Sequence, residues 1–377
     1  MKVVLAPNAF KDSLSARQVA AALARGLRRA CPLVQCVILP VADGGDGTLN
    51  VLEEALGATR REVTVKDPLG RLHSGNFLRW GRGEHGLVET AQATGLALLS
   101  PRERNPLLTT SFGAGQLVRH ALASGVLKLA VTVGGSATND GGAGFLQALG
   151  ARFCDHRGHH LGQPLNGQAL AAVRSVDLSA IRRVATLVET RVLCDVDNPL
   201  CGPNGASMTF GPQKGADRET CLHLDENLKK FYQLVEKETG TDVAALPGSG
   251  AAGGLAAALM SVLNARVEPG AEAVLRWLKA DHAFSTAQLV VTGEGCADRT
   301  TLEGKAPGAV STMARRWGAQ VVLVAGAITE ASRPLLEQRF DECLSLGTEA
   351  RAPAATVEKA LEVAGYTLGR KLEARKN

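Results

Sequence analysis

Three short stretches of the chain combine glycine with carboxylate side chains. They are 43–48, 134–142 and 293–298, and each follows an apolar run typical of a buried strand. Glycine lets backbone N–H groups approach an anion closely, whereas a carboxylate in the same loop repels that anion unless a cation such as Mg²⁺ lies between them. The combination indicates metal-assisted binding of phosphate, although each stretch taken alone is also explained by a tight turn with an Asp cap.

A pair of carboxylates follows another predicted strand. The apolar run 192–194 leads directly into Asp195 and Asp197, and strand alternation places both carboxylates on the same side. A carboxylate at a strand end can accept a proton from a substrate hydroxyl or bind a metal ion. The Asn198-Pro199 pair that follows is equally typical of an ordinary turn, so both interpretations stay open.

Three lysines lie in loops rich in Gly, Pro and Ser rather than on the exposed face of a predicted helix. Lys11, Lys214 and Lys305 could each balance the charge of a phosphate group, although a loop lysine is more commonly a solvated surface residue. Lys305 follows a glycine, but Ala306 comes next and the upstream glycine of a P-loop is absent, which excludes a P-loop NTPase.

One glycine motif, 248–253, has the G-x-G-x-x-G spacing of dinucleotide-binding loops. It follows 244–247, which is not a convincing strand, and it opens the predicted helix 255–263. Gly253 and Gly254 can therefore contact a phosphate at the helix start or simply let the helix pack closely. Neither a G-x-S-x-G elbow nor a catalytic cysteine signature is present, so hydrolase chemistry has no support.

The elements that must position these residues alternate between strand and helix at both ends of the chain. Near the N-terminus a short strand, a helix with a capping box at Ser15, a second strand and a second helix follow each other. The same order returns near the C-terminus, whereas the middle of the chain contains strand-like pieces that follow one another directly. The predicted strands of the two end regions are 3–6, 37–39, 288–292, 321–324 and 343–346.

This pattern predicts an α/β protein with a discontinuous domain. Residues 1–65 and 280–377 are expected to form a Rossmann-like open parallel sheet, interrupted by a second, inserted α/β domain of residues 66–279. Two strands alone cannot complete a parallel sheet, so strand 3–6 should pair in parallel with 289–292. Ligands bind where the strand order of such a sheet reverses, which predicts an active site in the cleft between the domains. The loops expected at the reversal point are 7–12, 43–48 and 293–298.

The composition narrows the functions further. The 377 residues are 45% hydrophobic and 21% charged, with a net charge of +5 spread along the chain and 4% aromatic residues. These values exclude a disordered chain and argue against nucleic acid binding. No apolar run approaches the roughly 18 residues of a membrane helix, no secretion signal is visible and the cysteines form no CxxC pair, which predicts a cytoplasmic protein with reduced thiols.

Seven long motifs, read in order, resemble the bacterial type I glycerate kinase family over essentially the whole chain. The resemblance implies an enzyme, a kinase that uses ATP and Mg²⁺ to phosphorylate D-glycerate, with 2-phosphoglycerate as the expected product. Two positions depart from the usual family pattern: Asn8-Ala9 stands where members usually carry Asp-Ser, and 296–300 stands where an Arg-Ile-Asp-Ser-Gln-like run is usual. The motifs lie at 6–16, 40–48, 133–144, 194–200, 210–216, 247–254 and 292–295.

Together, the residue chemistry and the resemblance define a set of expected site residues. Asp195, Lys11 and Lys305 are expected to act in catalysis, and Asp195, Glu294 and Asp298 are expected to bind magnesium. The expected partners are D-glycerate and ATP, with no nucleic acid or membrane partner, and homodimer formation is left open. The residues expected to bind substrate or phosphate are Asp43, Gly44, Gly45, Asp46, Gly134, Gly135, Ser136, Asn139, Asp140, Gly253 and Gly254.

Two other functions stay open at this point. A nucleotide-dependent oxidoreductase would use 248–253 as its dinucleotide loop, although the missing strand and the many carboxylates argue against it. A catalytically silent, ligand-sensing family member would explain the departures at Asn8-Ala9 and Cys296-Ala297. A kinase would turn over a hydroxy acid with ATP, whereas neither of these alternatives would.

Overall fold

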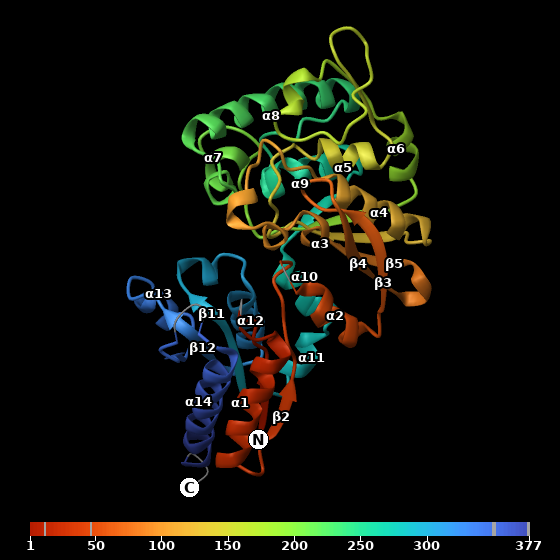
Figure 1. Ribbon diagram of the computed structural model, residues 1–377. Coiled ribbons are helices and arrows are strands. Elements are labelled where there is room, and N and C mark those ends of the chain that lie inside the picture. Colours follow the sequence, from red (N-terminus) through yellow and green to blue (C-terminus); the bar gives the residue numbers. More distant parts are fainter. Residues whose placement is uncertain (11–12, 46, 349–351, 375–377) are drawn as a thin grey trace. The chain divides into compact units, whose positions relative to one another are not determined.

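The chain folds into two compact units, each built from more than one segment of the sequence. The computed structural model describes residues 1–10, 13–45, 47–348 and 352–374. Unit 1 consists of Met1–Asp43, Asn50–Leu56 and Pro269–Asn377, so it combines the red N-terminal and the blue C-terminal elements in Figure 1. Unit 2 consists of Gly44–Leu49 and Gly57–Glu268.

These units divide the chain at positions that differ from the expected domain boundaries at 65/66 and 279/280. Strand β3 (Thr59–Lys66) lies in unit 2, because it pairs antiparallel along its whole length with β4 (Leu72–Trp80). Helix α10 (Gly270–Trp277) lies in unit 1, where Ala271 and Leu275 belong to that unit's apolar core.

Unit 1 contains a five-stranded sheet whose neighbouring strands are all parallel. The predicted pairing of the first strand is confirmed, since Val3 lies opposite Leu289 and Leu5 opposite Val291. The strand order reverses between β1 and β11, because the chain continues from β1 to β2 on one side and returns as β11 on the other. The order is β13 (Glu342–Ser345), β12 (Gln320–Ile328), β11 (Leu289–Ala297), β1 (Lys2–Leu5) and β2 (Gln35–Ile38).

Helices cover both faces of this sheet, and the strands are apolar for that reason. Val3 and Leu5 face α1 (Ala16–Ala30) and α14 (Ala354–Ala374), whereas Val4 faces the opposite layer. Ser15 caps α1 as predicted, accepting a hydrogen bond from the Gln18 backbone N–H. The opposite layer contains α10, α11 (Ala280–Phe284), α12 (Ala306–Arg315) and α13 (Arg333–Glu337).

Unit 2 contains a mixed six-stranded sheet, and the predicted α/β class is confirmed in both units. Strands β3, β4 and β5 are antiparallel neighbours, whereas β5, β6, β9 and β10 run parallel to one another. A separate antiparallel pair joins β7 to β8. The remaining strands are β5 (His85–Glu89), β6 (Lys128–Thr132), β7 (Arg152–Cys154), β8 (Ser175–Asp177), β9 (Glu189–Leu193) and β10 (Arg266–Glu268).

The helices of unit 2 enclose one large apolar core with this sheet. Residues of α4, α5, α8 and α9 all contribute to it. Among the described residues, no helix combines the length and the apolar character that a membrane crossing requires. The helices of unit 2 are α3 (Ala91–Thr94), α4 (Phe112–Ala123), α5 (Ala143–Ala148), α6 (Ser179–Ala185), α7 (Ala206–Phe210), α8 (Arg218–Thr239) and α9 (Ala251–Val262). Helix α2 (Thr48–Leu56) begins in unit 2, and its residues from Asn50 onward belong to unit 1.

One predicted loop is a strand. The stretch 293–297 continues β11, and it pairs in parallel with β12 from Val324 to Ile328. Gly293 permits this continuation, because a Cβ atom there would lie 2.0 Å from the Val324 carbonyl oxygen. The prediction of a loop failed because Gly and Glu are uncommon inside strands.

Candidate active site

Residues from three segments meet at the carboxyl end of the sheet in unit 1. The Asn8 backbone N–H donates to the Gly293 carbonyl at 2.8 Å, and the Asn8 Nδ2 donates to Asp43 Oδ2 at 3.0 Å. Asn8 therefore joins the segments that follow β1 and β2 to β11, at the point where the strand order reverses. An aspartate at position 8 would set two carboxylates against each other, whereas the asparagine amide supplies a donor.

Beside this point, one lysine lies between two carboxylates. The Lys305 Nζ is 3.6 Å from Glu294 Oε2 and 3.6 Å from Asp298 Oδ1. Asp298 caps the short 3-10 helix Arg299–Leu302, and its Oδ1 accepts the Thr300 N–H at 2.8 Å. Lys305 occupies the N-cap position of α12, without a side-chain capping hydrogen bond. Two of the three charged groups thus lie at the starts of helices, whereas Glu294 lies within β11.

Burial and the lysine charge act in opposite directions on these carboxylates. Burial raises the pKa of Glu294, and the nearby Lys305 ammonium opposes this rise. Burial also raises the pKa of Asp298, but its hydrogen bond with the Thr300 side chain and the Lys305 charge outweigh that effect, so the pKa is lowered overall. The lysine therefore lowers the electrostatic cost of having two carboxylates side by side.

A magnesium ion fits the same carboxylates. Glu294 Oε1 is buried and has no hydrogen-bond partner among the described residues, which marks it as an acceptor for a missing cation or donor. The described part of the chain contains no group of three side chains able to hold a metal by themselves. Mg²⁺ in phosphoryl-transfer sites needs only one or two carboxylates, since substrate phosphates and waters complete its shell. Glu294 and Asp298 suit such a site, and the expected metal role of Asp195, a residue of unit 2, stays a prediction.

Three parallel strands of unit 2 end at one edge of its sheet. Glu89, Thr132 and Leu193 lie in register at the ends of β5, β6 and β9. Beyond these ends follow the stretch 134–142 and Asp195. The carboxylates and glycines predicted from separate segments therefore share one sheet edge within unit 2.

The Glu89 carboxylate caps the start of α2, a role that sequence reasoning missed. It accepts the backbone N–H groups of Gly47 at 3.2 Å and Leu49 at 3.1 Å. A side chain of the protein therefore supplies the negative charge at the start of α2, where a phosphate group was expected to bind. The sequence shows that Glu89 ends a buried strand, as Asp195 follows one, but it does not show which backbone groups Glu89 contacts.

The expected glycines of unit 2 allow close backbone contacts. A Cβ atom on Gly134 would lie 3.0 Å from the Gly45 Cα, so the segment of Gly44 and Gly45 packs directly on the stretch after β6. The Gly135 carbonyl accepts the Leu96 N–H at 2.9 Å. Ser136 is 5% exposed, and its Oγ lies 2.9 Å from Thr138 Oγ1.

Asp140 anchors this stretch and is closed to solvent. Its carboxylate accepts hydrogen bonds from the Ser111 N–H at 2.7 Å and hydroxyl at 2.8 Å, and from the N–H groups of Gly142 at 3.1 Å and Gly144 at 3.3 Å. Burial raises its pKa, and these hydrogen bonds oppose the rise. Because its oxygens accept these hydrogen bonds within the protein, Asp140 shapes the loop, and its expected role in binding substrate or phosphate stays a prediction.

Asn139 is also fully buried. Its Nδ2 donates to the Ser207 Oγ at 2.9 Å, while its Oδ1 is without a hydrogen-bond partner in the described part of the chain. The side chain is therefore held by α7, the helix that carries Ser207, and does not face open solvent.

Gly253 and Gly254 pack against the same loop. Their φ angles are +66° and +90°, and the Gly253 carbonyl accepts the Gly141 N–H at 2.9 Å. A Cβ atom on Gly253 would lie 2.1 Å from the Thr138 carbonyl oxygen. The sequence allowed two interpretations of these glycines, phosphate contact and close packing of the helix, and this geometry agrees with close packing. In the described chain the element directly before the motif is the helix α8 and not a strand, so the oxidoreductase alternative gains nothing from it.

Asp195 is half-buried just beyond β9. Burial raises the pKa of the adjacent Cys194 thiol to about 11, and the negative charges of Asp195 and Asp197 act in the same direction. Asp197 is exposed. Two other expected residues, Lys11 and Asp46, lie outside the residues that the structure describes.

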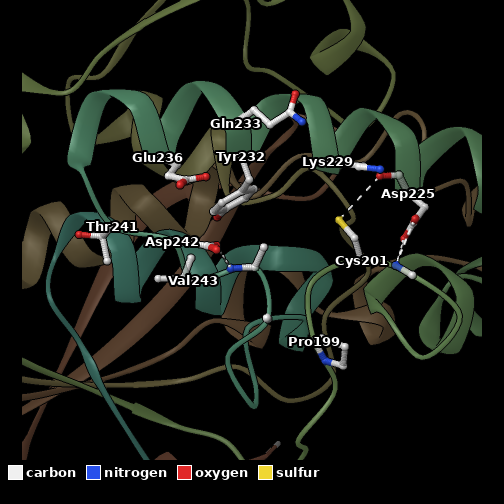
Figure 2. A pocket seen from close by; sticks show the side chains of 13 residues that line it. Pro199, Cys201, Asp225, Lys229, Tyr232, Gln233, Glu236, Thr241, Asp242 and Val243 are labelled. Carbon is white, nitrogen blue, oxygen red and sulfur yellow. Dashed lines mark hydrogen bonds between the residues drawn. The ribbon is translucent and has the colours of Figure 1, made fainter.

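A cavity of about 470 Å³ lies elsewhere in unit 2, along one side of α8 (Figure 2). None of the expected site residues lines it. The Tyr232 ring forms part of its wall, and the Tyr232 hydroxyl donates to the carbonyls of Gly141 at 2.9 Å and Gly254 at 3.1 Å. Burial raises the pKa of Cys201 in the same wall to about 12, so this thiol is not a nucleophile at neutral pH.

Comparison with known proteins assigns a family to the chain. Residues 3–372 match the family model described as Glycerate kinase family. A glycerate kinase of Halalkalibacterium halodurans is 40% identical over 344 residues, which cover 91% of this chain and 90% of the relative. The glycerate 2-kinase of Escherichia coli strain K12 is 42% identical over 348 residues, which cover 92% of this chain and 91% of the relative.

A solved structure agrees with these relatives. The crystal structure of a candidate glycerate kinase 2 from Salmonella typhimurium LT2 matches with a TM-score of 0.88 and 37% identity. The match covers 100% of this chain and 99% of the other. The similarity therefore extends over both units.

The anchoring role of Asp140 predicts a large loss of stability in Asp140→Asn. The asparagine keeps the shape but turns an NH₂ group toward backbone N–H donors, so we expect the free energy of unfolding to fall by about 3 kcal/mol or more. Urea denaturation measures this change, with Asp197→Asn, an exposed carboxylate, as the matched control that stays near wild type. Equal stability of the two variants would contradict the role.

Proposed function

The chain belongs to the glycerate kinase family, and we propose that it transfers the γ-phosphoryl group of ATP to a hydroxyl of D-glycerate, giving 2-phosphoglycerate and ADP. The observation that carries this proposal is the match to the family over residues 3–372, together with relatives that are named glycerate kinase and are about 40% identical. Each unit contributes residues whose chemistry suits one part of this reaction.

The proposed part of unit 1 is to bind and neutralise the phosphates. Phosphoryl transfer spreads negative charge over the γ-phosphate oxygens, so catalysis depends on positioning and on nearby positive charge. The Lys305 side chain is 31% exposed, and its ammonium group can pair with a phosphate oxygen. Glu294 and Asp298 would hold Mg²⁺, which supplies further positive charge to the triphosphate when bound.

The proposed part of unit 2 is to bind and activate glycerate. The half-buried Asp195 accepts the proton of the reacting hydroxyl while the hydroxyl oxygen bonds to the γ-phosphorus and the bond to the β-phosphate oxygen breaks. Ser136 and the backbone amides around Gly134 offer hydrogen-bond donors for the glycerate carboxylate. Lys11, which the resemblance suggests, keeps its proposed role as a partner for negative charge.

The reaction is tested by measuring ADP release with a panel of hydroxy acids, each with and without Mg²⁺. The proposal predicts ADP formation that requires both D-glycerate and Mg²⁺. An active, folded preparation with no ADP above background would overturn it and would favour a ligand-sensing protein without turnover.

Removal of the proposed proton acceptor should reduce turnover more than stability. We expect Asp195→Asn to lower kcat by roughly 100-fold, because an amide cannot accept the hydroxyl proton. Steady-state kinetics with saturating ATP and glycerate measure this. Glu219→Gln, an exposed carboxylate on α8, is the matched control. Near wild-type kcat in a folded Asp195→Asn protein would show that Asp195 has another role.

Removal of the proposed phosphate partner should weaken use of ATP. We expect Lys305→Met to lower kcat/KM for ATP by about tenfold or more, since a charge-assisted hydrogen bond contributes about 1.5–3 kcal/mol. The control is Lys359→Met, which removes an exposed lysine of α14 in the same unit. If both variants keep the wild-type kcat/KM for ATP, Lys305 does not contact the nucleotide.

A further inference from the structure

Lys214 is a buried lysine whose environment the reaction described above does not use. It ends the 3-10 helix Pro212–Lys214 between α7 and α8, and the residue is 2% exposed. Its Nζ donates to the Thr138 carbonyl at 2.7 Å. Burying an ammonium group carries a large desolvation cost. A buried lysine therefore indicates that the positive charge has a role at that position.

The charged and titratable groups around Lys214 come from several elements. Burial lowers the pKa of Lys214 to about 8, whereas the negative charge of Asp140 favours the protonated form of Lys214. The Tyr232 phenol of α8 donates to the Gly141 carbonyl in the same loop. The Cys221 thiol of α8 packs against Gly211, three residues before Lys214 in the sequence. Asp140 is the acidic group whose charge acts on Lys214.

The hydrogen bond of Lys214 determines the direction of one peptide group. The Thr138 carbonyl oxygen accepts the hydrogen bond of Lys214 and also lies against Gly253, where a Cβ atom would come within 2.1 Å of it. The same peptide group carries the N–H of Asn139, whose side chain α7 holds through Ser207. A rotation of this peptide would therefore disturb the loop on both sides, toward Ser136 and toward Asp140.

We propose that Lys214 is a positioning residue for phosphoryl transfer, whose ammonium holds the Thr138 carbonyl so that the loop 134–142 keeps the shape in which it meets substrate. This inference rests on the proposed function. Asp140 accepts four hydrogen bonds and so anchors the second half of the loop, and Lys214 anchors its middle. Lys214 does not itself touch the reacting atoms.

The test compares Lys214→Met with Lys230→Met, which removes a lysine of α8 whose side chain is 66% exposed. We expect Lys214→Met to lower kcat at least tenfold, while the melting temperature stays level or rises because a buried charge has been removed. We also expect the amides of 136–144 to exchange hydrogen faster in Lys214→Met, with exchange in unit 1 unchanged. Lys230→Met should match wild type in all three measurements.

The ionisation of Lys214 gives a readout that needs no variant. Wild-type kcat should fall as the pH rises through about 8, because the neutral amine loses its charge. The free energy of unfolding should rise over the pH range in which kcat falls. Between about 8 and the unfolded value of 10.5 the unfolded chain binds more protons, so unfolding becomes less favourable as the pH rises. Both pH effects should be absent in Lys214→Met.

The outcomes separate this inference from the proposed function. Wild-type kcat in Lys214→Met, or a parallel loss of kcat and melting temperature, would overturn the positioning role. If Lys214→Met does not fold, a wild-type kcat that is flat between pH 7 and 9.5 overturns it. If no glycerate turnover occurs in wild type, the proposed function fails, and unchanged exchange of 136–144 in Lys214→Met then rejects the anchoring role on its own.

Discussion

The parallel pairing of β1 with β11 brings the two ends of the chain into one sheet and so determines how the sequence is divided between the two units. It joins Val3 to Leu289 across most of the chain, so the intervening segment must leave unit 1 and return. Residues 57–268 do this by forming a sheet and core of their own. The same pairing creates the strand-order reversal at which Asn8, Asp43 and Gly293 meet, the position where open α/β sheets bind ligands.

Two lysines show how the protein uses positive charge beside carboxylates. Lys305 is partly exposed between Glu294 and Asp298, so its charge is available to a ligand. Lys214 is buried near Asp140 and bonds to a backbone carbonyl, so its charge acts on the shape of a loop. The difference lies in burial: an exposed ammonium can exchange partners with substrate, whereas a buried one is committed to the protein.

The sequence predicted strands and helix starts correctly where a local signal, such as an apolar run or a capping residue, determined them. Apolar runs gave the strands of unit 1, and Ser15 with Gln18 marked the start of α1. Prediction failed where distant residues decide. The structural role of Asp140 was missed because nothing nearby in the sequence shows that Ser111 donates to it from 29 residues away. Glu89 was missed because its partners at 47 and 49 belong to another segment.

Phosphoryl transfer from ATP to glycerate can be followed by ³¹P NMR of the protein with ATP, Mg²⁺ and D-glycerate. We expect loss of the γ-phosphate signal and growth, in equal amount, of ADP and a phosphate ester resonance coupled to the C2 proton of glycerate. Conversion of ATP to ADP and inorganic phosphate alone, or no change in the ATP signals, would contradict it.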